Sequence, residues 1–446
     1  MTRAPAVALL ALVLLTLPAS AQPPAASIFP YQTVTETLDN GLEVILIPMS
    51  SGGLVAYWTV VRTGSRDEFE TGRTGFAHFF EHMMFRGTER FPASVYNAKV
   101  TEIGADANAF TSDDLTAFHL SITKDDLDTV MDLESDRFQK LDYPEALFRT
   151  EAGAVYGEYR KNRASPFFTL FEALQAAAFT THTYGHTAMG YEDDIKRMPE
   201  LYDYSRGFFS RYYRPENVVL LIVGDLDPDA TLDKVRAQYG AWPRGYQAPE
   251  IKPEPEQTKE RRIQVAYAGS SLPILGLGYK VPAFKPDDRT YVAVDVLGDL
   301  LFGETSPLHK KLVLDEQVVE FLFANLTPNR DPSLMSITAR VKDPEKVDYV
   351  LAEIDRTIEE AREKAVDAKR LAELKARRKY GFLMNLSTPS QVAGALARYI
   401  AVTGGIEAID QVFATLNQTT PADIQEAART YLIPTRRTIA VLRGAS

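Results

Sequence analysis

The stretch GFAHFFEHMMFRGT, residues 75–88, places two of the chain's six histidines four residues apart with a glutamate between them. Phenylalanine and methionine fill most of the positions around His78, Glu81 and His82. An ionisable group buried among such side chains costs free energy unless it is paired or bound to a metal. The stretch therefore predicts a buried helix over 74–86, ended by Gly87, that needs partners for its polar groups.

The three polar residues of this helix share one face, because His78, Glu81 and His82 stand at i, i+3 and i+4. Two imidazoles one turn apart can bind one Zn²⁺ at about 2.0–2.1 Å per nitrogen. The glutamate between them can accept a proton from a zinc-bound water. The alternative is a pair of structural core histidines with a helix ion pair. Histidine is rare in this chain, so we favour the metal interpretation.

A third zinc ligand is expected from another element, because hydrolytic zinc sites use three protein ligands and one open position. A helix predicted over 145–163 carries Glu151 and Glu158, seven residues apart on one face. A solvated helix surface is the other explanation for both glutamates. Glutamate is common, so the residues alone do not assign either one.

The composition limits the classes of function. At 446 residues the chain is too long for one ordinary core, which favours two or more domains. The formal net charge of −11 makes nucleic acid and anionic membranes poor partners. Cysteine is absent, so disulfides are excluded and any metal site must use histidine and carboxylate ligands.

Residues 1–21 predict a secretory signal peptide. An apolar run over 6–17 is broken by Pro18, and an A-x-A cleavage site follows at 19–21. The run is short for a membrane span, and we expect no span after cleavage. The sequence therefore predicts export to the periplasm.

The order of predicted elements restarts after a proline-rich, charged stretch at 242–262, which is typical of a domain linker. The helix predicted over 288–303 takes the place in the second half that the helix over 74–86 has in the first. We therefore expect an internal duplication with a zinc-binding half at 28–241 and a homologous half without the motif at 263–446. The predicted fold class is α+β, with an antiparallel sheet packed by helices in each half.

The combination of HFFEH with a glutamate 76 residues after His82 resembles the inverzincin metallopeptidases, the pitrilysin, insulin-degrading enzyme and mitochondrial processing peptidase group. The resemblance implies that His78, His82 and Glu158 bind one Zn²⁺ per chain. It also implies that Glu81 is the catalytic base and that Glu151 has a supporting role.

The resemblance runs from about residue 34 to the end, and it is strong in the first half and weak after the linker. It implies a clamshell-type half that forms a chamber with a second chain. It also implies a zinc-dependent endopeptidase whose peptide substrate adds as an extended strand to a sheet edge. Asn108, Ala109 and Phe110, in the sequence NAFT, match that edge.

The chain departs from this family in the stretch 306–325. Active family members use an arginine and a tyrosine seven residues apart to hold the substrate and its oxyanion, but Val313 and Glu320 stand in those places. The chain therefore resembles the zinc-bearing subunit of a heterodimer whose sister chain supplies R-x6-Y. The alternatives are a non-catalytic assembly subunit and a self-sufficient homodimer with another oxyanion device.

The other four histidines are expected to be structural. His182 and His186 are four residues apart, but glycine and turn-forming residues surround them and argue against a helix. His119 and His309 have no partner within a recognisable pattern.

Overall fold

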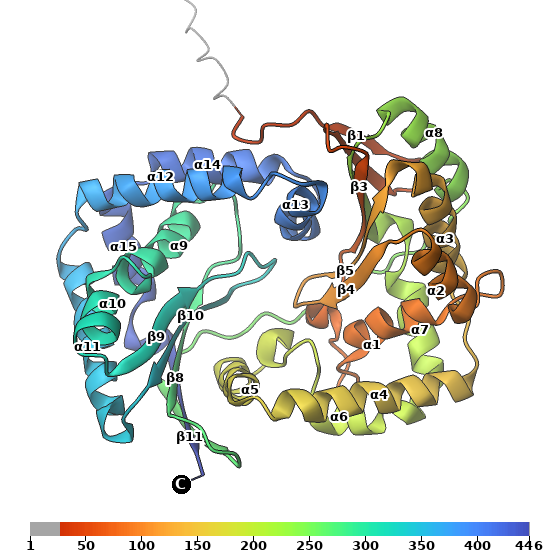
Figure 1. The fold of residues 1–446 in the computed structure, drawn as a ribbon. Helices are drawn as coiled ribbons and strands as arrows, with labels where there is room; N and C mark the ends of the chain where they lie inside the picture. Colours follow the sequence, from red (N-terminus) through yellow and green to blue (C-terminus); the bar gives the residue numbers. More distant parts are fainter. Residues whose placement is uncertain (1–26, 446) are drawn as a thin grey trace, which may run out of the picture.

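Two β-sheets organise the chain, and the structure, a computed structural model, describes residues 27–445 (Figure 1). The expected signal peptide lies outside the described residues. The first sheet has the order β1-β2-β6-β3-β5-β4, and its strands are β1 Val34–Thr37, β2 Glu43–Pro48, β3 Leu54–Val61, β4 Asp106–Thr111, β5 Thr116–Thr123 and β6 Val218–Gly224. The second has the order β7-β11-β8-β10-β9, and its strands are β7 Arg261–Tyr267, β8 Ile274–Val281, β9 Val319–Asn325, β10 Ser333–Val341 and β11 Arg437–Gly444.

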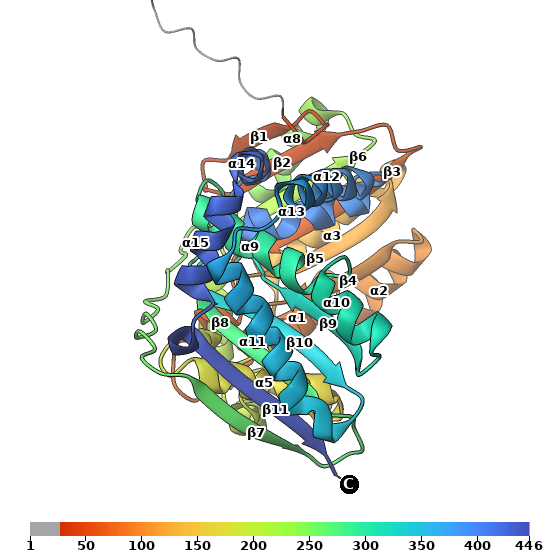
Figure 2. The same cartoon turned by 90° about the vertical axis from the view of Figure 1, so that its left-hand side faces the viewer.

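The second sheet repeats the first without its hairpin strand β1. The order β2-β6-β3-β5-β4 matches β7-β11-β8-β10-β9, and the parallel pairs β2–β6 and β7–β11 fall in equivalent places. All other neighbouring strands are antiparallel. The expected fold class, two homologous α+β halves, is confirmed, with one parallel pair in each sheet. In Figure 2 the edge strands β4 and β9 both lie at mid-height of the molecule.

Helices cover both sheets. Those that precede β7 are α1 Phe76–Met83, α2 Ala93–Glu102, α3 Leu127–Lys140, α4 Glu145–Arg163, α5 Pro166–Ala178, α6 Glu192–Arg197, α7 Tyr202–Tyr212 and α8 Pro228–Tyr239. Those that follow it are α9 Arg289–Phe302, α10 Pro307–His309, α11 Val347–Glu363, α12 Ala368–Met384, α13 Pro389–Thr403, α14 Glu407–Gln418 and α15 Pro421–Tyr431. Between 27 and 445 no single helix is long and apolar enough to cross a membrane; α13 and α14 reach that length and composition only together, across a 92° bend.

Helix α1 lies in the first core, as the apolar stretch predicts. Phe79, Phe80 and Met83 are fully buried against the first sheet and the helices around it. A 3₁₀ turn continues the helix over Met84–Arg86, and Gly87 ends it with a φ of 86°, a value that favours glycine. The helix predicted over 74–86 is thus confirmed in position and in burial.

Helix α9 takes the place in the second half that α1 has in the first. It follows β8 and packs on β9 and β10, as α1 follows β3 and packs on β4 and β5. Ion pairs from Arg378 on α12 to Asp295 and Asp299 join the two helices here. An ion-pair cluster therefore lies between α9 and α12, whereas histidines and glutamates lie between α1 and α4.

One helix of each half packs on the sheet of the other half (Figure 1). Helix α5 leaves the first half and packs Leu170 and Leu174 on β7, β8 and β11. Helix α13 of the second half packs Leu396 and Ile400 on β3 and β6, beside the buried Trp58. Sequence periodicity did not indicate this exchange of helices. Because of the exchange, the core of each half includes residues of the other half.

We expect Leu396→Ala to lower the free energy of unfolding by about 2–5 kcal/mol, because it leaves a cavity against the first sheet. Urea denaturation followed by circular dichroism should show a single transition that includes both halves. Gln391→Ala, at an exposed position of the same helix, is the control and should stay within about 0.5 kcal/mol of wild type. Two separate transitions, with only one moved by Leu396→Ala, would contradict the shared core.

Candidate metal centre

A buried carboxylate fixes the start of the helix that carries the motif. Glu68 accepts hydrogen bonds from the backbone N–H groups of Gly75 and Ala77, each at 2.7 Å. These are N–H groups that a helix N-terminus leaves without an internal partner. Burial raises the pKa of Glu68 to about 8, although the two backbone hydrogen bonds oppose the shift. Sequence analysis did not identify Glu68, because it lies eight residues before the first residue of the helix and outside any capping pattern.

Three ligand atoms converge between α1 and α4. The Nε2 atoms of His78 and His82 lie 3.7 and 3.2 Å from Oε2 of Glu158. Ligand atoms of these three residues all lie within 4.8 Å of one another. Tetrahedral zinc with bonds of about 2.0–2.1 Å needs ligand atoms roughly 3.3 Å apart. Two imidazole nitrogens and a carboxylate oxygen at this spacing fit a zinc ion.

Glu151 orients the second histidine. Its Oε1 lies 3.1 Å from Nδ1 of His82, and Arg86 donates to both of its carboxylate oxygens at 2.9 and 2.6 Å. Burial raises the pKa of Glu151, but the hydrogen bonds with His82 and Arg86 outweigh it and hold the pKa below its usual value. A carboxylate at Nδ1 keeps the proton on that nitrogen and turns the Nε2 lone pair toward Glu158.

His78 is buried and lacks a polar partner for Nδ1 among the described residues. Burial lowers its pKa to about 4, with the neighbouring His82 acting in the same direction. The imidazole is therefore neutral at physiological pH and offers a lone pair. The distance from its Nε2 to Glu158 is too long for a hydrogen bond, so a metal ion at Nε2 would satisfy an otherwise unpaired group.

Glu81 lies between the ligand cluster and the edge of the first sheet. Its Oε2 accepts a hydrogen bond of 2.7 Å from Oγ1 of Thr111, the last residue of β4. Burial raises the pKa of Glu81, although the bond from Thr111 opposes the shift. Sequence analysis missed Thr111; the available signal was its place directly after the strand residues Asn108, Ala109 and Phe110.

Asn108, Ala109 and Phe110 form the middle of β4, the last strand of the first sheet. They pair on one side with β5, and no described strand pairs with the other side. Ala109 is buried in the first core, whereas Asn108 and Phe110 are exposed. The edge that sequence analysis assigned to a peptide strand thus lies beside the carboxylate of Glu81.

The other four histidines lie outside the ligand cluster, as expected for structural residues. His182 lies 3.1 Å from Asp331 through its Nε2 and accepts a hydrogen bond from the backbone of Tyr184. His186 lies beside the carbonyl of Thr187. His119 stacks on a tryptophan of the neighbouring strand, and His309 is the last residue of the short helix α10 in the second half.

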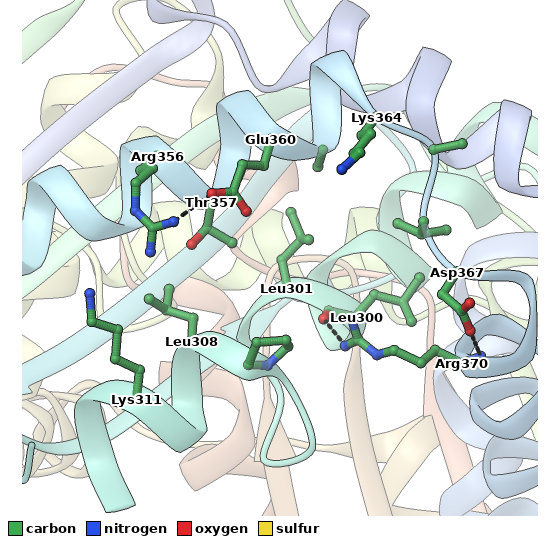
Figure 3. A pocket seen from close by; sticks show the side chains of 14 residues that line it. Leu300, Leu301, Leu308, Lys311, Arg356, Thr357, Glu360, Lys364, Asp367 and Arg370 are labelled. Carbon is green, nitrogen blue, oxygen red and sulfur yellow. Dashed lines mark hydrogen bonds and ion pairs between the residues drawn. The ribbon is translucent and has the colours of Figure 1, made fainter. Parts of the chain in front are cut away.

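Val313 and Glu320 lie in the second half. Val313 is half-buried on the short helix Lys310–Asp315, and Glu320 is exposed on β9, 3.4 Å from Arg340. A cavity of about 340 Å³ lies nearby between α9, α10 and α11, and its lining contains no residue of the ligand cluster (Figure 3). We find no oxyanion donor at either of these two positions.

Two family models match this chain, and both describe domains of M16 peptidases. A family model described as "Insulinase (Peptidase family M16)" matches residues 44–192, and one described as "Peptidase M16 inactive domain" matches residues 202–378. The two matches fall on the half that carries the ligand cluster and, after α6, on the segment that runs into the second sheet.

Relatives match over nearly the whole chain. The protein "Zinc protease PqqE" of Helicobacter pylori is 29% identical over 414 residues, which cover 91% of this chain and 92% of that protein. The mitochondrial-processing peptidase subunit beta of Dictyostelium discoideum is 23% identical and covers 90% of this chain and 86% of its own length.

Solved structures share the fold. A protease from Helicobacter pylori has a TM-score of 0.87 at 27% identity, covering 93% of this chain and 99% of that one. The periplasmic protease PqqL from Escherichia coli has a TM-score of 0.74 at 19% identity, covering 94% of this chain and 48% of that one.

We expect the purified protein to contain about one zinc per chain, as a three-ligand site predicts. His82→Ala should lose most of it, and Glu151→Gln should weaken zinc affinity by about 10–100-fold because His82 loses its orienting carboxylate. Elemental analysis after dialysis against competing chelator measures both. His119→Ala, outside the cluster, should retain wild-type zinc. Full zinc in His82→Ala would contradict the ligand assignment.

Proposed function

Because this chain belongs to the M16 peptidase family, we propose that it is a zinc-dependent endopeptidase that hydrolyses peptides or unfolded polypeptides. One observation carries the proposal: the three ligand atoms of His78, His82 and Glu158 converge beside the carboxylate of Glu81 and an unpaired strand edge. Ligands, base and peptide-binding edge are the three parts that a zinc endopeptidase needs.

The proposed roles follow from the contacts. A zinc ion bound by His78, His82 and Glu158 supplies Lewis-acid polarisation of a peptide carbonyl and lowers the pKa of a water. Glu81 is the proposed base. Thr111 occupies its Oε2, so Oε1 remains to accept a proton from water and to return it to the leaving amine. Burial raises the pKa of Glu81 and thereby makes it a stronger proton acceptor for the first half of this transfer.

We assign substrate binding to the β4 edge. An extended peptide that pairs with the backbone of Asn108, Ala109 and Phe110 would gain main-chain hydrogen bonds with little dependence on sequence. Thr111, in the same strand, holds the base. A peptide paired with β4 is therefore placed relative to Glu81 by the strand itself.

We further propose that the active enzyme is a heterodimer. Val313 and Glu320 offer no cation or phenol to a developing oxyanion, so a sister chain with R-x6-Y would supply them. A relative whose name is subunit beta of a processing peptidase supports this arrangement. The complete ligand-and-base set disfavours a non-catalytic assembly subunit. A self-sufficient homodimer is the alternative that the partner experiment below tests.

The remaining assignments come from the sequence. We propose the zinc-binding half at 28–241, the linker at 242–262 and the half without the motif at 263–446. We also propose export to the periplasm through the signal peptide at 1–21, and the periplasmic relative in Escherichia coli supports that location.

Glu81→Gln keeps the size of the side chain and removes the proton acceptor. We expect zinc to stay bound while kcat for peptide cleavage falls by at least about 10²-fold, the scale of losing a general base. Fluorogenic peptide hydrolysis, measured with any required partner present, checks the result. Glu102→Gln, at an exposed position of α2, is the matched control. Wild-type turnover by Glu81→Gln would remove Glu81 from the mechanism.

The chain alone should bind zinc and cleave peptides poorly. Loss of one oxyanion donor typically costs about 10²–10³ in kcat, and neither Val313 nor Glu320 can act as such a donor. Adding a sister chain that carries R-x6-Y should restore turnover, and replacing the arginine of that chain should abolish the restoration. Full activity of the purified chain without any co-purifying protein would instead support the self-sufficient homodimer.

A further inference from the structure

Arg330, in the loop between β9 and β10, inserts its guanidinium into the first half. Its Nε donates to Asp114 at 3.1 Å, and one terminal nitrogen donates to Asp67 at 3.2 Å and to the carbonyls of Arg62 and Asp114 at 3.1 and 3.0 Å. Its backbone N–H donates to the same Asp114 carboxylate at 3.2 Å. One residue of the half without the motif therefore contacts three separate positions of the zinc-binding half.

The two carboxylates face this cation and also Arg66, which lies 3.1 Å from Asp67 and 3.8 Å from Asp114. The side chains of Asp67 and Asp114 have no exposure to solvent, and that of Arg330 is 16% exposed. Removing Arg330 would leave these two buried acids with less compensating positive charge, which costs more than losing a surface pair. The planar fork of arginine spans both acids, which a lysine ammonium cannot do in the same way.

Asp67 connects Arg330 to helix α1, which carries His78, Glu81 and His82. The next residue, Glu68, caps α1 through Gly75 and Ala77, and His78 follows directly. Displacing Asp67 would therefore displace the residue that fixes the start of α1.

Asp114 connects Arg330 to Glu81, the proposed base. It lies in the turn that follows β4, three residues after Thr111, whose hydroxyl holds Oε2 of Glu81. Arg398 of α13 also binds this turn, because it donates a 2.8 Å hydrogen bond to Oγ of Ser112. The second half thus holds the turn at two points next to Thr111.

The loop that contains Asp67 and the turn that contains Asp114 are hydrogen-bonded to each other. The backbone N–H groups of Ser65 and Arg66 donate to the carbonyls of Ser112 and Asp113 at 3.1 and 2.8 Å. The approach requires glycine at the preceding position, because a Cβ on Gly64 would lie 2.2 Å from the Ser112 oxygen. The loop before α1 and the turn after β4 therefore behave as one body, with Arg330 between their acidic residues.

We propose that Arg330 is a positioning residue, through which the half without the motif holds Glu81 and the metal-bearing helix in their working arrangement. The proposal rests on the assignment of Glu81 as base. Arg330 itself touches none of the ligand residues and neither carboxylate oxygen of Glu81, so its effect passes through Asp67 and Asp114.

Arg330→Gln and Arg330→Lys test this, with Arg437→Gln as control. Arg437 is mostly buried and bridges the partly exposed acids Glu260 and Asp355, so its loss breaks an ion cluster that includes no residue of the β4 turn. In metal-free protein, Arg330→Gln should speed amide hydrogen exchange of 64–68 and 111–115 by about 10-fold or more while β7 stays unchanged. The lysine variant keeps the charge and should restore part of the protection.

Kinetics separate positioning from stability. With the chain loaded with zinc, kcat of Arg330→Gln should fall by about 10-fold or more with KM within about twofold, because a small displacement of a base is costly. The loss should not add to that of Thr111→Val in a double-mutant cycle, since both act on Glu81. Arg437→Gln should keep wild-type kcat below its unfolding temperature.

Unchanged exchange at 64–68 and 111–115 in both Arg330 variants would overturn the proposal. Faster exchange with wild-type kcat, or strictly additive losses with Thr111→Val, would also overturn it. A wild-type protein that cleaves no peptide in any partner mixture would refute the proposed function instead. The exchange data, taken on metal-free protein, would still decide whether Arg330 holds these two segments.

Discussion

The structure depends on placing ionisable groups on a helix that is otherwise buried. Helix α1 sits among phenylalanines of the first core, and His78, Glu81 and His82 occupy its remaining face. Different elements satisfy most of these groups: Glu151 of α4 binds His82, Thr111 of β4 binds Glu81, and Glu68 binds the start of the helix, whereas Nδ1 of His78 has no polar partner among the described residues. Since an unpaired buried polar group costs about 1–3 kcal/mol, these elements cannot be shifted independently.

The duplicated fold shows two ways of pairing polar groups between equivalent helices. The two sheets share one strand order, and α1 and α9 hold equivalent places. In the second half the helices that correspond to α1 and α4 are joined by Arg378 with Asp295 and Asp299. The same framework therefore accommodates either a candidate metal cluster or an ion-pair cluster between these two helices, and local side chains decide which.

Periodicity and one motif predicted much of this from sequence. The helix at 145–163 and the position of α1 were predicted because each is encoded by local apolar spacing. The convergence of Glu158 and Glu151 on α1 came from family resemblance, since spacing left both glutamates open. Thr111, Glu68 and Arg330 were missed. Their roles arise from contacts between segments distant in sequence, for which no local pattern exists.

The exchange of α5 and α13 was missed for the same reason, and it changes how the second half is understood. Without α13, the sheet face that includes Trp58 and Val60 would lie open to water. Apolar burial stabilises by roughly 25 cal/mol per Å², so uncovering a whole sheet face removes more than a domain's net stability. The half without the motif is thus needed for folding before any chemistry is considered. Arg330 and Arg398 enter the first half from that same surface, so packing and the proposed positioning of Glu81 would share one interface.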